Sequence, residues 1–188
     1  MDTAGKSEKI VYESIGTIRT PYTDWAPFYA PEKEAEEGLF RIELKAEYAE
    51  GLKDLDTFKF IYVLFHFDRS ERKDRWLAHP PSLKGGEVGT FASRSQRRPN
   101  GIGLSIVKLQ RIEGNTIYIG PIEAFDGTPL LDLKPYFGSS DAKKDAGDGW
   151  FDKLEDKEHQ LMHMMGISHD HDDHDHGHGH GHGHDHEH

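Results

Sequence analysis

Short runs of alternating apolar and polar residues fill most of the first 137 positions, and turn-forming residues separate them. The pattern predicts strands over residues 10–19, 38–44, 58–67, 88–92, 102–111, 116–119, 122–125 and 130–133. The run at 58–67 is the most apolar, and its β-branched and aromatic residues predict a buried central strand. The triplet at 113–115 predicts a hairpin, and the Asp-Gly-Thr-Pro sequence at 126–129 predicts a turn.

Helical spacing is rare by comparison. Residues 47–55 predict a short helix, and residues 150–165 predict an amphipathic helix with the apolar anchors Phe151, Leu154, Leu161, Met162 and Met165. Many short strands, tight turns and little helix predict a mainly β fold, a small barrel-like domain of short strands. Neither Gly-x-Gly-x-x-Gly after a strand nor a P-loop motif occurs, so we expect a non-Rossmann domain.

Composition divides the chain into three parts. We expect a β domain over residues 1–137, a linker with a short helix over 138–167, and a tail rich in His, Asp and Gly over 168–188. The net charge is −11, and the 4 basic and 13 acidic residues of 138–188 contribute −9 of it, so the acidity says little about what the β domain binds. The absence of cysteine excludes disulfides and thiolate metal sites. The polar start, and the lack of an apolar stretch of about 20 residues, predict a cytoplasmic protein without a membrane span.

One segment of the chain is basic. Residues 69–98 hold eight basic and three acidic side chains, and Arg94, Arg97 and Arg98 lie within five positions of one another beside two glycines. Glycines let a ligand approach the backbone closely, and guanidinium groups bind carboxylate or phosphate. The segment predicts a site for an anionic ligand, and an exposed basic hairpin without a ligand is the alternative. Asp126, at the head of its turn, either caps the turn backbone or faces a cation or a donor-rich ligand.

Four blocks of the sequence resemble one known family. They are residues 15–22 (IGTIRTPY), 63–69 (VLFHFDR), 89–105 (GTFASRSQRRPNGIGLS) and 126–136 (DGTPLLDLKPY). In this order, over about 120 residues, they resemble the TsaA-like or TrmO-like family of tRNA methyltransferases. The family versions of three of the blocks run close to I-G-x-I-x-[ST]-P-Y, G-x-F-A-T-R-S-x-x-R-P-N-P-I-G-x-S and D-G-T-P-V-x-D-I-K-P-Y.

The resemblance implies a small β-barrel-like domain that works as a homodimer, with S-adenosylmethionine as cofactor and tRNA as substrate. It implies methyl transfer to N6 of the threonylcarbamoylated adenosine just 3′ of the anticodon. The matching positions imply a set of cofactor-binding residues, of which the first three follow no anchoring motif: Glu37, Gly38, Leu39, Asp68, Arg69, Arg94, Leu104, Gly127, Thr128, Pro129 and Leu130.

The same hypothesis gives roles to individual side chains. Asp126 and Asp68 are the candidate catalytic residues that accept the N6 proton, because a carbamoylated nitrogen is a poor nucleophile and needs a base. Arg94 would pair with the carboxylate of the cofactor or with that of the threonyl group. The candidate RNA-binding residues, which together with Arg69 would contact phosphates, are Arg72, Lys73, Arg97 and Arg98.

The sequence departs from the family pattern near the arginines and at its end. Gly101 stands where the family has a proline, Gln96 and Arg97 follow the Arg-Ser pair, and a different tail replaces the longer C-terminal part of the bacterial enzymes. These departures leave two alternatives open. One is a methyltransferase for a small-molecule acceptor, and the other is a metal-storage or metal-delivery protein whose domain only senses the cofactor.

The tail predicts a metal-binding segment that is disordered without metal. Imidazoles flanked by carboxylates bind divalent transition metals such as Ni²⁺, Zn²⁺, Co²⁺ or Cu²⁺. An expression tag is the alternative, but the interleaved Asp and Gly favour a natural tail. The candidate ligands are His169, His171, His174, His176, His178, His180, His182, His184, His186 and His188. Of the other histidines, His66 is expected to pack in the core, and His159 and His163 to lie on a helix surface.

Overall fold

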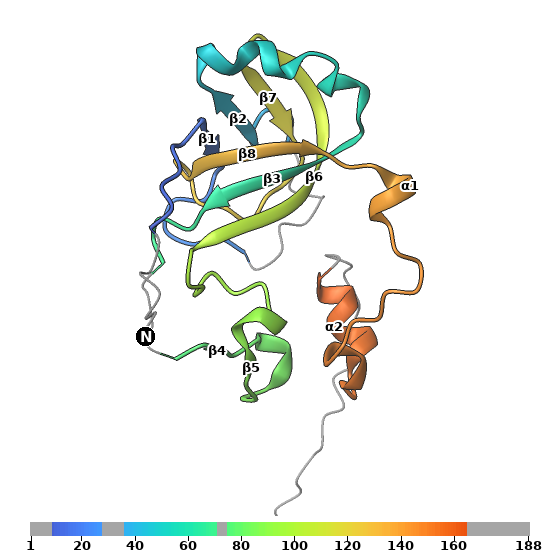
Figure 1. Ribbon diagram of the computed structural model, residues 1–188. Helices are drawn as coiled ribbons and strands as arrows, with labels where there is room; N and C mark the ends of the chain where they lie inside the picture. Colours follow the sequence, from blue (N-terminus) through green and yellow to red (C-terminus); the bar gives the residue numbers. More distant parts are fainter. Residues whose placement is uncertain (1–8, 28–35, 71–74, 165–188) are drawn as a thin grey trace, which may run out of the picture.

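Six antiparallel strands close into a barrel in the computed structural model, which describes residues 9–27, 36–70 and 75–164 (Figure 1). The order around the barrel is β1-β2-β7-β6-β3-β8, and the pairing of β8 with β1 closes the ring. The strands are β1 (Gly16–Arg19), β2 (Arg41–Leu44), β3 (Phe60–His66), β6 (Ile102–Glu113), β7 (Thr116–Ile119) and β8 (Pro129–Pro135). The predicted mainly β, barrel-like fold is confirmed.

Alternation of side chains builds the core of this barrel. In β3, Ile61, Val63 and Phe65 point inward and are at most 1% exposed, as period-two geometry requires of a half-buried strand. The same alternation places His66, which follows Phe65, on the outer face of the strand. His66 is exposed there, so the expectation that it packs in the core is wrong. Inward residues of the other strands complete the core, among them Ile18, Ile42, Ile117, Ile119 and Leu130.

One predicted strand forms only in part, and another does not form within the described residues. Residues 10–15 lie outside β1, and residues 122–125 are irregular although Ile122 and Ala124 are buried in the core. The side-chain hydroxyl of Thr20 donates to the carbonyl of Ala124 at 2.8 Å, so a side chain partly replaces the strand ladder there. The predicted helix at 47–55 forms as two short 3₁₀ helices, η2 (Ala46–Leu52) and η3 (Leu55–Thr57), separated at Asp54, whose φ is 65°.

A second, smaller unit lies below the barrel in Figure 1. We call residues 75–98 the arm; it contains β4 (Leu77–Ala78), η4 (Pro81–Leu83), β5 (Val88–Gly89) and η5 (Thr90–Ala92). After β8 come α1 (Gly138–Asp141), η6 (Phe151–Lys153) and α2 (Lys157–Met164). The predicted helix at 150–165 is therefore right only in its second half, because Phe151 and Leu154 precede α2. No helix within the described ranges is long and apolar enough to span a bilayer.

Gly101 and Gly103 let the start of β6 pass close to β3. Gly101 has a φ of 54°, in the left-handed region, and its carbonyl accepts the N–H of Phe67 at 2.8 Å. A Cβ at position 103 would lie 2.3 Å from the Cε2 atom of Phe65. The glycine at 101 is thus required by this backbone, since the proline of the family pattern fixes φ near −65°.

Replacing Gly101 by proline should lower the free energy of unfolding by about 2–3 kcal/mol, because the ring cannot adopt a positive φ. Gly101→Ala should cost about 1–2 kcal/mol for the same backbone. Gly51→Ala is the matched control, because an added Cβ there meets no atom within 4 Å and the φ is not positive. Urea unfolding measures all three, and a proline variant as stable as the parent would show that this turn has another backbone.

Candidate functional site

The first and last sequence blocks pair at one end of the barrel. The N–H of Asp126 donates to the carbonyl of Tyr22 at 2.8 Å, and the N–H of Gly127 donates to Ile18 at 2.9 Å. In return, the N–H of Ile18 donates to the carbonyl of Thr128 at 2.9 Å. These bonds fix the Asp-Gly-Thr-Pro turn against the end of β1.

Arg69 joins a third block to this pair. Its guanidinium donates to the carbonyl of Asp126 at 3.1 Å and also to the carbonyl of Thr23. The guanidinium carbon lies 4.7 Å from the ring centre of Phe125, within cation–π range. Arg69 therefore holds the turn that was predicted to bind the cofactor, and much of its hydrogen-bonding capacity is used inside the protein.

The carboxylate of Asp126 faces β1. It accepts the N–H of Thr20 at 3.2 Å, and its other oxygen lies 3.5 Å from the guanidinium of Arg19. Arg19 also donates to Glu43 at 2.9 Å, and this hydrogen bond lowers the pKa of Glu43. The carboxylate of Asp126 therefore binds the end of β1, and among the described residues it makes no hydrogen bond to the backbone of its own turn of the kind that a turn-capping residue would make.

Asp68 differs from Asp126 in this respect. Its N–H donates to the carbonyl of His66 at 2.9 Å, whereas its side chain is exposed and makes no hydrogen bond or ion pair within the described residues. Of the two candidate catalytic carboxylates, Asp68 is the one available to a ligand.

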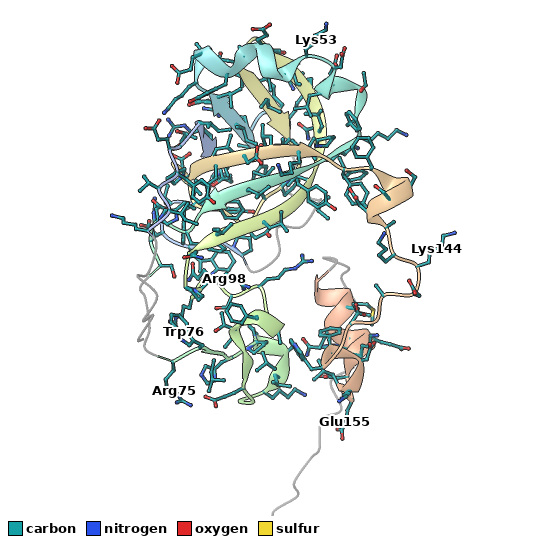
Figure 2. The ribbon with its side chains drawn as sticks, viewed as in Figure 1. Lys53, Arg75, Trp76, Arg98, Lys144 and Glu155 are labelled. Atoms are coloured by element: carbon teal, nitrogen blue, oxygen red, sulfur yellow. The ribbon has the colours of Figure 1, made fainter. Side chains whose placement is uncertain are left out.

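The arginine turn, residues 93–98, is folded around Arg98. One terminal nitrogen of Arg98 donates to the carbonyl of Ser93 at 2.7 Å and approaches the carbonyls of Thr90 and Ser95 at 3.3 and 3.4 Å. Figure 2 shows Arg98 where the arm meets the barrel. A guanidinium with this many carbonyl partners stabilises its own turn, which differs from the phosphate contact predicted for Arg98.

Arg94 and Arg97 project from the same turn and are exposed. Within the described part of the chain, neither guanidinium makes a hydrogen bond or an ion pair, whereas every other arginine there does: Arg19, Arg41, Arg69, Arg75, Arg98 and Arg111. Two unpaired guanidinium groups on a turn held from within provide donors for a carboxylate or a phosphate.

Residues 67–70 connect the arginine turn to the Asp-Gly-Thr-Pro turn. The hydroxyl of Ser70 donates to the carbonyl of Gln96 at 3.1 Å, and the preceding residue, Arg69, bonds to Asp126. The two motifs therefore lie on the same side of the molecule and are bridged by the residues that follow β3. This juxtaposition is what a shared ligand site requires.

The remaining candidates lie around this region. Leu104 is 51% exposed on the outer face of β6, directly across from Leu64 of β3. Glu37 pairs with Arg111 at 2.8 Å, and Leu39 is 38% exposed. Gly38 precedes Phe40, whose ring lies 5.7 Å from that of Tyr22, so residues 36–40 enter beside the first sequence block.

A cavity of about 370 Å³ lies elsewhere, between η2, η3 and β8, and none of its lining residues belongs to the candidate set. Arg72, Lys73 and the ten tail histidines lie outside the described residues. Within the described residues, no cluster of three or more His, Asp or Glu side chains has the arrangement of a metal site.

The fold and the site define a class of protein: a closed antiparallel barrel with unpaired arginines beside a glycine turn, unrelated in topology to Rossmann domains. Comparison with known families gives a more specific assignment. The family model of the tRNA-methyltransferase O N-terminal domain matches residues 17–142. The chain belongs to this family.

Known relatives agree with this assignment. A protein of Pyrococcus abyssi named as a probable S-adenosyl-L-methionine-binding protein is 37% identical over 146 residues, covering 77% of each chain. The tRNA (adenine(37)-N6)-methyltransferase of Escherichia coli is 32% identical, over 72% of this chain and 61% of its own length. The crystal structure of TrmO from Pseudomonas aeruginosa superposes with a TM-score of 0.61 at 29% identity, covering 76% of this chain and 62% of that one. The chain thus spans about three fifths of these bacterial relatives.

Proposed function

We propose that the chain is an S-adenosylmethionine-dependent methyltransferase that methylates N6 of adenosine 37 in tRNA, the base next to the anticodon. The observation that carries this proposal is the pair of unpaired guanidinium groups, Arg94 and Arg97, on a turn bridged to the Asp-Gly-Thr-Pro turn. The names of the E. coli and mammalian relatives support the reaction. The finer proposals are a threonylcarbamoylated substrate and action in the cytoplasm.

The donor set fits the proposed cofactor. S-adenosylmethionine has a carboxylate, which the unpaired guanidinium of Arg94 can bind. Exposed Leu104 provides an apolar contact, and an added Cβ at Gly127 would meet no atom within 4 Å, so the surface at Gly127 is open to a ligand, whereas Thr128 and Leu130 are buried at 3% and 0% exposure. When bound, the cofactor supplies an electrophilic methyl group on a sulfonium sulfur.

The protein's own groups must orient the acceptor and receive its proton. Methylation of N6 would release the proton of N6, and a carboxylate of the protein would accept it. Asp68 is the better placed of the two proposed bases, because Asp126 already bonds to Thr20 and Arg19. Alignment of donor and acceptor by the site can account for roughly 7–11 kcal/mol of the barrier.

Incubation of the full chain with labelled S-adenosylmethionine tests the reaction. Transfer RNA with and without the threonylcarbamoyl group at position 37 are the two acceptors. We expect label at N6 of the modified RNA and little on the unmodified RNA. Label on both RNAs would contradict the requirement for a threonylcarbamoyl group. Label on neither RNA would contradict tRNA as the substrate and favour a small-molecule acceptor.

Arg97 and Arg98 should differ in RNA binding. Arg97→Ala should reduce the slope of log K against log salt by about 0.7, because one phosphate contact to a single-stranded loop is lost. Arg98→Ala should leave that slope unchanged, since its guanidinium bonds to carbonyls of its own turn. Fluorescence anisotropy with a labelled anticodon stem-loop at several salt concentrations measures both. Equal slopes for the parent and Arg97→Ala would exclude a phosphate contact by Arg97.

We further propose that two copies associate through the outer face of β3 and β6. Ile102, Leu104 and Ile106 are 40%, 51% and 47% exposed there and form a continuous apolar stripe, which on a water-exposed strand marks an interaction surface. Light scattering tests this: Ile106→Glu should be monomeric, and Lys108→Glu on the same strand face should remain a dimer. A monomeric parent chain would contradict the proposal.

We also propose, from composition alone, that the tail of residues 168–188 binds metal. The proposed division of the chain stays at residues 1–137, 138–167 and 168–188. Dialysis against Ni²⁺ or Zn²⁺ should show binding at pH 8 that weakens toward pH 6, as the imidazoles become protonated. A variant with the ten tail histidines changed to alanine should lose this binding and retain methyl transfer. Loss of transfer in that variant would favour the metal-delivery alternative.

A further inference from the structure

The segment of residues 148–157, which we call the brace, follows the matched family domain and contacts the arm. The indole N–H of Trp150 donates to the carbonyl of Ala92 at 2.8 Å, across 58 positions of sequence. Ala92 ends η5 and lies two residues before Arg94. The brace therefore bonds directly to the backbone from which the unpaired arginines project.

A second contact joins the brace to the other side of the arm. The ammonium group of Lys84 lies 3.1 Å from the carboxylate of Asp156. Lys84 directly follows η4 in the connection from β4 to β5, whereas η5 follows β5 at the other end of this antiparallel pair. The arm is thus held at two separate turns, and Figure 1 shows η6 and α2 next to it.

Burial outside the barrel indicates a second packed unit. Phe151 and Ala78 are 9% and 6% exposed, yet neither belongs to the barrel's core cluster. Thr90 is 1% exposed in the same arm. These residues come from the brace and from β4 and η5 of the arm, so both segments bury side chains outside the barrel core.

The brace is itself held in one conformation. Lys157 forms ion pairs with Asp152 and with Asp148, the latter at 3.3 Å. The N–H of Asp148 donates to the carboxylate of Asp152 at 2.7 Å. Trp150 lies between Asp148 and Asp152 in this turn, so its backbone is restrained on both sides.

We infer that the brace positions the arginine turn, with Trp150 as a positioning residue for Arg94. Among the described contacts, the hydrogen bond from Ser70 to Gln96 ties the arginine turn to the residues that follow β3. It is made two residues after Arg94 in the sequence. Trp150 fixes the turn on its other side. The inference rests on the proposed function only for the role of Arg94; the restraint of the arm is a physical property that can be measured without cofactor.

Trp150→Phe in the full chain is the decisive variant, because it keeps an aromatic ring and removes the N–H donor. Amide hydrogen exchange over residues 90–98 should become roughly five- to ten-fold faster, the effect expected from loss of one hydrogen bond. The KM for S-adenosylmethionine should rise by a similar factor, and kcat should change by less than about two-fold, because the chemical groups are unchanged. Glu155→Gln is the control, because Glu155 lies in the same segment and points away from the arm (Figure 2).

A charge exchange provides a second, independent test. Lys84→Asp and Asp156→Lys should each speed exchange in the arm by roughly two- to three-fold, and the double variant should restore the parent rate. Unchanged exchange in Trp150→Phe, or no recovery in the double variant, would overturn the inference. If the parent chain transfers no methyl group but exchange in the arm responds as expected, the proposed function fails while the restraint by the brace stands.

Discussion

Replacing Arg94 by alanine should lower kcat/KM for methyl transfer by about 100-fold or more, because a charged group of the ligand loses its guanidinium partner. The melting temperature should stay within the error of the parent, since the Arg94 side chain is exposed and unpaired within the described residues. Arg94→Lys should fall between the two, because an ammonium group keeps the charge and loses the planar pair of donors. Initial rates at varied S-adenosylmethionine concentration measure the effect.

Arg75 offers the matched control for this experiment. It lies in the same arm and pairs with Glu87 at 3.6 Å, and its side chain is 74% exposed. Arg75→Ala removes the same charge from the same unit and should change kcat/KM by less than about three-fold. Full activity of Arg94→Ala, or an equal loss in Arg75→Ala, would show that the unpaired state of Arg94 has no bearing on the ligand.

Replacing Phe65 by alanine should lower the free energy of unfolding by about 3–5 kcal/mol. The ring is 1% exposed, packs edge-on against Phe67 at 5.2 Å and lies directly over Gly103. Phe91→Ala is the control, because the Phe91 ring is 78% exposed and its loss should cost no more than about 0.5 kcal/mol. Urea unfolding followed by tryptophan fluorescence measures both.

The contact between Phe65 and Gly103 makes a further outcome specific. Gly103→Ala alone should cost about 1–3 kcal/mol, because its methyl group would overlap the ring. In the Phe65→Ala background the same change should be close to neutral, because the vacated space accepts the methyl group. Additive effects of the two substitutions would be inconsistent with the observed approach of β6 to β3.

The sequence pattern predicts the barrel well where alternation and strand pairing agree. In β3 every second residue is apolar and buried, and both neighbouring strands, β6 and β8, provide hydrogen-bond partners. At 122–125 the alternation is equally clear, but Pro121 lacks an N–H and the Thr20 hydroxyl binds the carbonyl of Ala124. The alternation there predicts correctly that Ile122 and Ala124 are buried, but it does not predict that this segment forms no strand.

The roles of the arginines could not be separated from the sequence. Arg94, Arg97 and Arg98 are equivalent in composition, and only the positions of the carbonyls of Thr90, Ser93 and Ser95 distinguish Arg98 from the others. Such contacts depend on backbone conformation, which residue type alone does not specify. The bond between Trp150 and Ala92 is likewise invisible in sequence, because no local pattern reports a partner so far away.

The positive φ of Gly101 has a consequence for how this turn diverged from its relatives. Proline and glycine codons differ by more than one base, and the intermediates between them encode alanine or arginine. Either residue would be strained at a φ of 54°, whereas both are compatible with the backbone that proline prefers. On the present backbone, a change between the two residues therefore has no unstrained intermediate one base away. Loops grafted between relatives at this point should be exchanged whole, since a single-residue swap combines one lineage's side chain with the other's backbone.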